Sequence, residues 1–231
     1  MTHSWYNLYK QANSLPFDLT IDEVDPRTFE FAKSKYSGMG NIDYHMYPET
    51  AEKEKQKKPK FLGCGLNGVV TDIGNNRVRK YTIDPTEATL AESLIENTKY
   101  PVVKVFSVEQ LQVSLWAIDM EKLTPVNKIA PQSNMFISDI AMYIKENNSE
   151  PSFNKFLLYL SSKGFININD EQFHKKLKPQ YKNVFKKMER FFLLKEIRLI
   201  DDLKIENLGE NSKGEWLLFD LQPIGSYNSL D

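Results

Sequence analysis

The sequence predicts an α+β fold in which a small antiparallel sheet precedes a largely helical region. Residues 60–123 hold short apolar runs separated by glycines and polar turns, a pattern that is typical of strands. Residues 134–197 carry apolar side chains at three- and four-residue steps, which is typical of amphipathic helices. Strands followed by helices, without regular alternation, favour the α+β class.

Composition restricts the kinds of protein that this chain can be. The 231 residues are 41% hydrophobic and 26% charged, as in ordinary globular proteins. Thirty basic and thirty-one acidic residues give a net charge of -1, so we do not expect a nucleic-acid partner. A minor alternative is nucleic-acid binding through the lysines of residues 53–60 and a basic helix face (Lys175, Lys176, Lys178, Lys182, Lys186 and Lys187). No apolar stretch reaches the roughly 18 residues that span a bilayer. We therefore expect a cytoplasmic protein with no membrane contact.

Cysteine and histidine give no sign of a disulfide or of a metal site. Cys64 is the one cysteine, and the three histidines (His3, His45 and His174) lie far apart in the sequence. Any bound metal ion would therefore have to use oxygen ligands.

The strand-rich part is expected to contain a hairpin and one helix. The tripeptide 74–76, Gly-Asn-Asn, suits a tight turn because these residues tolerate positive φ. Residues 85–99 form the expected helix, with a proline at its start. Residues 100–123 alternate in a way that predicts two strands around a turn near Glu109 and Gln110.

The second half is expected to contain three helices and a final hairpin. The helices are predicted over residues 134–148, 151–164 and 178–197, with Gly164 ending the second. Residues 216–220, Trp-Leu-Leu-Phe-Asp, are expected to pair with the region near Leu208. A short helix is also expected over residues 25–37, and residues 49–60 are rich in lysine and glutamate, as in a solvated linker. The predicted parts are therefore an N-terminal extension with linker (1–58), a strand-rich part (59–123) and a helical part (124–231).

The first motif with possible chemistry is a G-x-G-x-x-G sequence formed by Gly63, Gly65 and Gly68. Glycine backbone can approach a phosphate closely and present N–H groups to it. Glycines in a tight hairpin explain the motif about as well. A strand follows it instead of a helix, which excludes the dinucleotide-binding version, and the G-K-[S/T] ending of a P-loop is absent.

The second motif is a lysine, Lys80, on the third predicted strand. The following helix carries Glu87, Glu92 and Glu96. A strand lysine held by a helical carboxylate can bind nucleotide phosphates. The alternative is an exposed strand lysine beside a solvated helix face.

The third motif combines Asp202 and Asn207 with Asp220, which lies thirteen residues after the asparagine. Carboxylate and amide oxygens are ligands for Mg²⁺, and a further carboxylate can accept the proton of an attacking hydroxyl. The alternative is an acidic surface turn. Apolar neighbours such as Leu203 and Phe219 favour placement against a core, where an unpaired charge is unfavourable.

Taken in order, these motifs resemble the protein-kinase-like superfamily between residue 61 and about residue 222. The resemblance implies a two-lobed fold with a small antiparallel N-lobe and a reduced helical C-lobe. It implies ATP and Mg²⁺ as cofactors. Gly63, Gly65 and Gly68 would lie over the triphosphate, and Lys80 would contact the α- and β-phosphates.

The same resemblance implies roles for further residues. Glu92 is the expected ion-pair partner of Lys80, with Glu96 as the alternative. Backbone groups of Glu121 and Leu123, in the hinge that begins at Met120, would bind adenine. The side chains expected to pack on the base are Leu62, Val70 and Val78. Asp202 would be the catalytic base, Lys204 its neighbouring lysine, and Asn207 and Asp220 the metal ligands.

The sequence also departs from the family pattern. Ile200 and Asp201 stand where the family has His-Arg, and Leu221 and Gln222 follow Asp220 in place of Phe-Gly. Eleven residues follow Asp220, without an activation segment. We therefore expect a minimal, atypical kinase that transfers phosphate to a hydroxyl of a protein partner or of itself. The alternative is a kinase-like module that binds nucleotide or a partner without catalysis.

Overall fold

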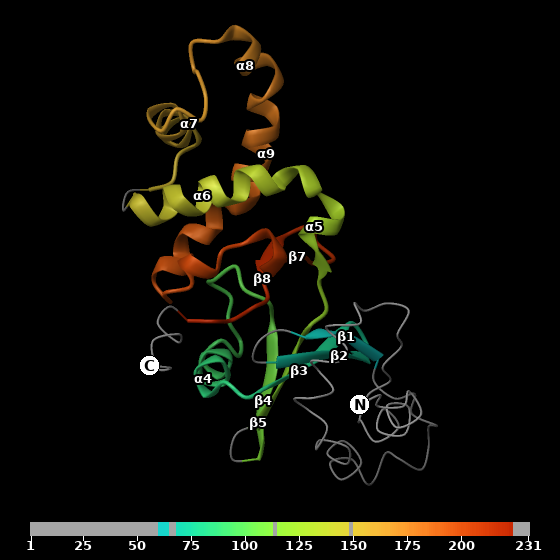
Figure 1. Ribbon diagram of the computed structural model, residues 1–231. Coiled ribbons are helices and arrows are strands. Elements are labelled where there is room, and N and C mark those ends of the chain that lie inside the picture. The colour runs from blue at the N-terminus through green and yellow to red at the C-terminus, as the bar shows by residue number, and fades with distance from the viewer. Residues whose placement is uncertain (1–59, 65–67, 113–114, 148–149, 224–231) are drawn as a thin grey trace, which may run out of the picture. The chain divides into compact units, whose positions relative to one another are not determined.

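The structure is a computed structural model that describes residues 60–64, 68–112, 115–147 and 150–223. The fold is mixed α+β, with antiparallel sheets and several helices (Figure 1). Its contacts divide the chain into two compact units. Among the described residues, the first unit comprises those within 60–95 and 105–122, and the second comprises those within 96–104 and 123–223. The helix expected over residues 25–37 and most of the lysine-rich linker lie outside the described residues.

The first unit contains a five-stranded antiparallel sheet in the order β1-β2-β3-β5-β4. The strands are β1 (Lys60–Cys64), β2 (Gly68–Gly74), β3 (Arg77–Thr82), β4 (Val105–Gln112) and β5 (Leu115–Glu121). The expected hairpin at residues 74–76 is confirmed, because Asn75 and Asn76 take φ values of 50° and 58° between β2 and β3. Asparagine tolerates this left-handed conformation better than most residues.

The predicted turn near Glu109 and Gln110 is wrong, because both residues lie inside β4. β4 is an edge strand of the sheet, and both side chains are exposed. Polar residues on the solvent side of an edge strand are common, and here they resemble the polar residues of a turn.

Helix α4 (Pro85–Ser93) is the expected helix of the first unit, and it is shorter than predicted. Asp84 is its N-cap residue, and the Asp84 side chain accepts hydrogen bonds from the backbone N–H groups of Thr86 (2.8 Å) and Glu87 (3.4 Å). After the helix, the side-chain oxygen of Asn97 accepts bonds from the N–H groups of Lys99 (3.0 Å) and Tyr100 (2.9 Å). These bonds favour a turn over further helix.

The second unit contains helices and a three-stranded antiparallel sheet in the order β6-β7-β8. The elements are β6 (Thr124–Pro125), α5 (Val126–Ile129), η2 (Pro131–Ser133), α6 (Asn134–Glu146), α7 (Phe153–Ser162), α8 (Glu171–Lys176), α9 (Lys178–Met188), η3 (Glu189–Lys195), η4 (Ile200–Asp202), η5 (Ile205–Asn207), β7 (Leu208–Glu210) and β8 (Trp216–Leu218). The three predicted helices are confirmed as α6, α7 and α9, although α9 gives way to the 3₁₀ helix η3. The predicted final hairpin is β7 with β8. The short helix α8 was not predicted.

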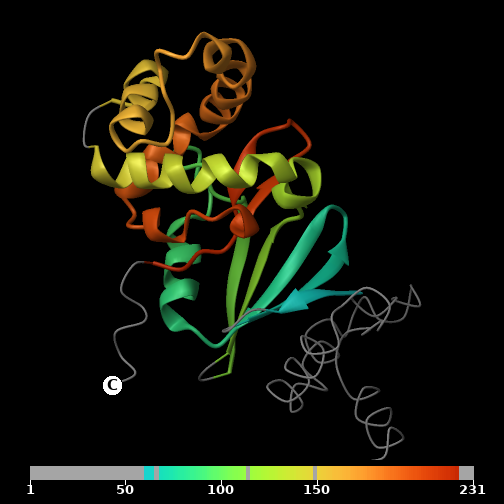
Figure 2. The same ribbon diagram turned by 45° about the horizontal axis from the view of Figure 1, so that its top comes forward.

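Aromatic side chains form the core among α6, α7 and α9, which lie side by side in Figure 2. The Tyr143 ring of α6 lies 5.4 Å from the rings of Phe156 and Tyr159 on α7. Phe156 stacks on Phe185 of α9 at 5.2 Å. Such ring pairs add to the stability that burial provides, and they fix the helices that precede the loop of Asp202.

Candidate functional site

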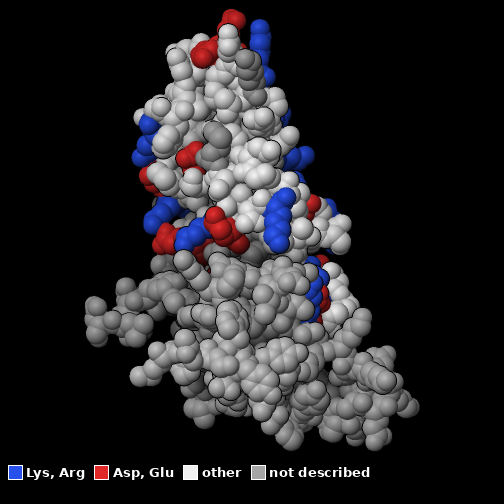
Figure 3. Space-filling view, turned by 45° about the vertical axis from the view of Figure 1, so that its right-hand side comes forward, with Lys and Arg blue, Asp and Glu red and all other residues white. Residues whose placement is uncertain are grey.

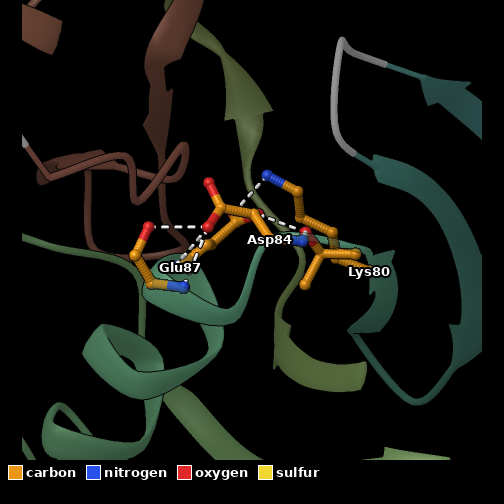
Figure 4. A network of polar contacts seen from close by, with 5 residues as sticks. Lys80, Asp84 and Glu87 are labelled. Atoms are coloured by element: carbon orange, nitrogen blue, oxygen red, sulfur yellow. Dashed lines mark hydrogen bonds and ion pairs between the residues drawn. The ribbon is translucent and has the colours of Figure 1, made fainter. Parts of the chain in front are cut away.

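The side chain of Lys80 lies in a buried ion pair at the start of α4 (Figure 4). Its Nζ atom donates to Oε1 of Glu87, and the two residues are 9% and 1% exposed. A lysine at this depth needs a counter-charge, since an isolated buried ammonium is strongly unfavourable. The sequence-based prediction of Lys80 as an exposed strand lysine, held open as the alternative, is thus excluded.

The predicted partner of Lys80 was wrong, because Glu87 takes the place expected for Glu92 or Glu96. Glu92 and Glu96 are both exposed, and Glu96 lies beyond α4 with a φ of 64°. Glu87 shares the buried face of α4 with Ala88 and Ala91. The two alanines mark that face in the sequence, so the helical phase was the signal that could have identified Glu87.

The glycines of the G-x-G-x-x-G motif differ in their surroundings. A Cβ atom on Gly68 would lie 2.8 Å from Cε of Lys80 and 2.8 Å from the carbonyl oxygen of Tyr81. A Cβ atom on Gly63 would meet nothing within 4 Å. Gly65 lies outside the described residues. Gly68 therefore makes room for the lysine side chain, which adds a structural reason for glycine at this position.

The strand register brings several predicted nucleotide-binding residues to one face of the sheet. Val70 pairs with Lys80, and Val78 pairs with Met120. Because alternate residues of a strand share a face, Val70, Val78, Lys80 and Met120 all lie on the same side, here called the Lys80 face. Val78 and Met120 are buried, and Val70 is half-buried.

The other three residues predicted to contact the base are not among the side chains grouped on the Lys80 face. Leu62 is 39% exposed. Glu121 is the last residue of β5, where it pairs with Arg77 of β3. The first unit ends one residue later, at Lys122. Leu123 belongs to the second unit, where its Cβ atom would lie only 2.5 Å from a Cβ added to Gly209. The backbone roles predicted for Glu121 and Leu123 stay predictions.

In the second unit, hydrogen bonds hold the loop of Asp202 against the strand end that carries Asp220. Nδ2 of Asn207 donates to the carbonyl oxygen of Asp202 at 3.1 Å. The backbone N–H of Phe219 donates to the carbonyl oxygen of Asn207 at 2.9 Å. The buried side chains of Leu203 and Ile205 anchor the same loop. The structure thus brings together the three residues that the sequence grouped.

Asp202 is a half-buried carboxyl group whose pKa is raised to about 6. Burial contributes most to this rise, followed by repulsion from the Asp220 carboxylate. Lys204 partly offsets the effect by attraction, and Asp201 adds to it. A carboxyl group with a pKa near neutrality can exchange a proton at the pH of the cell.

Asn207 and Asp220 have the chemistry of a Mg²⁺ site. Mg²⁺ commonly binds one or two protein oxygens and completes its shell with water and substrate phosphates. Among the described residues, no group of three or more His, Cys, Asp or Glu side chains is placed to hold a metal. An asparagine oxygen and one carboxylate nevertheless fit Mg²⁺ that is shared with a phosphate ligand, and repulsion between Asp202 and Asp220 would be relieved by a cation.

One buried ion pair was not predicted as a feature of the sheet. Nε of Arg79 donates to Oδ1 of Asp119 at 2.7 Å, and its NH2 group donates to Oδ2 at 3.0 Å. The two residues are direct partners across β3 and β5, on the face opposite Lys80. The strand register, which the sequence leaves open, was needed to find this pair.

The described surface agrees with the balanced composition. Figure 3 shows acidic and basic side chains close to one another on one face of the described residues. In the helical region, Lys187 pairs with Glu210 at 2.7 Å and Lys145 with Asp201 at 2.5 Å. None of the described helices has the length and apolar character needed to cross a membrane.

The chain shows weak structural similarity to solved structures and no match to a family or to a curated protein. No family model matches the chain, and no curated protein matches it. A solved structure of aminoglycoside phosphotransferase APH(4)-Ia matches with a TM-score of 0.35 and 7% identity, over 79% of this chain and 71% of that one. A thermostable mutant of the same enzyme, in ternary complex with AMP-PNP and hygromycin B, matches with a TM-score of 0.29 and 9% identity.

This second match covers 46% of the present chain, which spans 36% of that enzyme. Aminoglycoside phosphotransferases are thus weak structural neighbours of the chain. At such TM-scores the similarity supports no conclusion about function, so the function has to be argued from the residues themselves.

Proposed function

We propose that the chain is a phosphotransferase that moves the γ-phosphate of Mg-ATP to a hydroxyl acceptor. The observation that carries this proposal is that hydrogen bonds through Asn207 hold the Asp202 loop against the strand end of Asp220. There, burial and the Asp220 carboxylate raise the pKa of Asp202 to about 6. A carboxyl group poised near neutral pH, beside oxygen ligands for Mg²⁺, is suited to phosphoryl transfer.

In this proposal the first unit binds the nucleotide. Lys80, held by Glu87, contacts the α- and β-phosphates. Val70, Val78 and Met120 offer an apolar surface to the base on the Lys80 face. Gly63, Gly65 and Gly68 supply backbone N–H groups to the phosphates, and the backbone of Glu121 and Leu123 binds adenine.

The second unit supplies the groups for metal binding and proton transfer. Asn207 and Asp220 would hold Mg²⁺, which neutralises charge on the phosphates when it is bound. Asp202 orients the acceptor hydroxyl and takes its proton. The acceptor oxygen forms a bond to the γ-phosphorus while the bond from that phosphorus to the β,γ-bridging oxygen breaks, which leaves ADP. Lys204, which is exposed and follows Asp202 by two residues, would attract the transferred phosphate.

The test is ATP consumption by purified protein with Mg²⁺, with labelled γ-phosphate to follow transfer to the chain itself or to added protein acceptors. Lys80→Ala and Asp220→Ala should each reduce turnover by about a hundredfold or more, because positioned charges provide most of the catalysis. Lys163→Ala is the control, since this exposed lysine pairs with Glu146 at 3.1 Å and has no role in the proposed site. Full turnover by both site variants would refute the proposal.

A second candidate is a module that binds nucleotide without transferring phosphate. The observation in its favour is that Ile200 and Asp201 replace the His-Arg of the kinase-like pattern, and that Leu221 and Gln222 replace Phe-Gly. A single-turnover assay with labelled ATP separates the candidates. Binding without any label transfer or ADP formation would favour the second.

A further inference from the structure

We propose that Thr82, at the end of β3, is a positioning residue that orients the Glu87 carboxylate and, through it, the Lys80 ammonium. This inference rests on the proposed function insofar as Lys80 binds phosphate. The claim about the geometry of Lys80 can be tested without any nucleotide.

The hydroxyl group of Thr82 has a defined direction. The residue is fully buried. Its Oγ1 atom accepts a hydrogen bond from the backbone N–H of Asp84 at 3.1 Å. The same hydroxyl donates to Oε2 of Glu87 at 2.8 Å. Because a backbone N–H can only donate, the hydroxyl must accept there, which leaves its own proton for the Glu87 carboxylate.

The Glu87 carboxylate is therefore bound at both oxygens. Oε1 accepts from Lys80, which Figure 4 labels together with Glu87. Oε2 accepts from Thr82. The backbone of Glu87 is also fixed, since its N–H lies in the cap formed by Asp84. Two bonds at different oxygens define the plane of the carboxylate, and hence the direction from which it can hold an ammonium.

All of these groups come from one short stretch of chain. Lys80 and Glu87 are seven residues apart, and Thr82 and Asp84 lie between them. The carboxylate belongs to the first turn of α4, next to the helix cap. A local arrangement of this kind is set by the turn between β3 and α4, so Thr82 is well placed to control it.

The substitution Thr82→Val removes the hydroxyl and keeps a branched side chain of similar size. Valine cannot donate to Oε2 of Glu87 or accept from Asp84, so the carboxylate loses one of its two fixed directions. Thr82→Ser keeps the hydroxyl and serves as the conservative variant. Thr71→Val is the matched control, because Thr71 is equally buried in the same sheet but bonds the carbonyl oxygen of Arg79, at 3.4 Å, on the opposite face.

The first measurement is the rate at which acetic anhydride modifies Lys80, followed by mass spectrometry at a fixed pH near 8. The reagent attacks the amine, so a carboxylate that holds the Lys80 Nζ atom in an ion pair slows the reaction. We expect Thr82→Val to increase the rate at Lys80 about tenfold, because hydrogen bonds to charged groups are among the strong ones. Thr82→Ser and Thr71→Val should react as the unsubstituted chain does.

A purely structural role for Thr82 gives a different pattern. In that case Thr82→Val lowers the melting temperature and leaves modification of Lys80 unchanged relative to the exposed Lys122. An equal rise in Thr71→Val would show that any lost buried hydroxyl loosens the sheet. Either result would overturn the proposal.

The second measurement is the Kd for Mg-ATP. Thr82→Val should weaken binding about fivefold, with Thr82→Ser restoring the affinity, since the displaced ammonium meets the phosphates less favourably. If the unsubstituted chain binds no nucleotide, the proposed function fails, while the modification rates still decide the role of Thr82. Unchanged modification of Lys80 in Thr82→Val would refute the inference whether or not the affinity changes.

Discussion

The two polar clusters of the molecule differ in the sign of the charges that they bring together. In the first unit a lysine and a glutamate of opposite charge, Lys80 and Glu87, neutralise each other in a buried pair. In the second unit two carboxyl groups, Asp202 and Asp220, lie close enough that one raises the pKa of the other. In the first arrangement opposite charges attract each other, whereas in the second the repulsion between two carboxylates raises the pKa of Asp202, and a proton or a cation would reduce that repulsion.

The clusters also differ in how far apart their residues lie in the sequence. Lys80 and Glu87 are seven residues apart and are joined by a capped turn. Asp202 and Asp220 are joined through η5 and the hairpin of β7 with β8. Whether Glu87 meets Lys80 depends on which face of α4 is buried. Whether Asp202 lies near Asp220 depends on the pairing of β7 with β8. Substitutions in the two units should therefore have different effects.

The largest effect on stability is expected from Glu87→Gln, which removes the carboxylate charge that the Lys80 ammonium contacts in the buried ion pair. Removal of one member of a buried ion pair typically destabilises a protein by about 3 kcal/mol or more. Glu92→Gln, on the exposed face of the same helix, should change stability by less than about 0.5 kcal/mol. Urea denaturation of both variants measures the difference. Equal losses would contradict the assignment of Glu87 as the partner.

A smaller effect is expected from Gly68→Ala, because its new Cβ atom would lie 2.8 Å from Lys80 and from the Tyr81 carbonyl. Relief of such contacts costs roughly 1–3 kcal/mol. Gly63→Ala meets nothing within 4 Å and should leave packing unchanged. Thermal unfolding compares the two. A larger loss in Gly63→Ala would show that Gly68 does not limit the position of Lys80.

The smallest effect, and one of opposite sign, is expected from Asp202→Asn. The pKa of Asp202 is raised from its ordinary value of 3.8 to about 6, so the folded chain holds this proton after the unfolded chain has lost it. The contribution of Asp202 to stability therefore falls as pH rises from about 4 to about 6 and stays low above that window.

Because asparagine has no charge to bury, Asp202→Asn should be more stable than the unsubstituted chain at pH 7.5, by about 1 kcal/mol after allowance for solvent screening of a half-buried group. The gain should vanish below pH 4. Denaturation at a series of pH values checks this, and a gain that is independent of pH would show that charge is not the cause.

The sequence predicted much of the fold because several local signals agreed. Asn75 and Asn76 indicated the hairpin of β2 with β3, and apolar periodicity indicated α6, α7 and α9. The turn predicted near Glu109 and Gln110 was wrong because the polar residues of an edge strand look like those of a turn. The end of α4 was missed because the turn that follows it depends on hydrogen bonds that the Asn97 side-chain oxygen accepts.

The site was predicted in part for similar reasons. Lys80 was identified by its place on a strand after the glycine motif, whereas its partner depended on which face of α4 is buried. Asp202 and Asp220 were grouped from the motif and its following hairpin. The raised pKa of Asp202 could not be predicted, because it depends on burial and on a neighbour eighteen residues away. Thr82 was missed because a lone threonine in a strand gives no signal.

The proposed function requires that Lys80 and Asp220 act on the same bound Mg-ATP. The most direct measurement is a double-mutant cycle on the Kd for Mg-ATP with Lys80→Met, Asp220→Asn and the pair. We predict that each substitution weakens binding, that Asp220→Asn removes the dependence on Mg²⁺, and that the double variant loses less than the sum of the two. Strictly additive losses, or affinity that neither substitution changes, would contradict the claim.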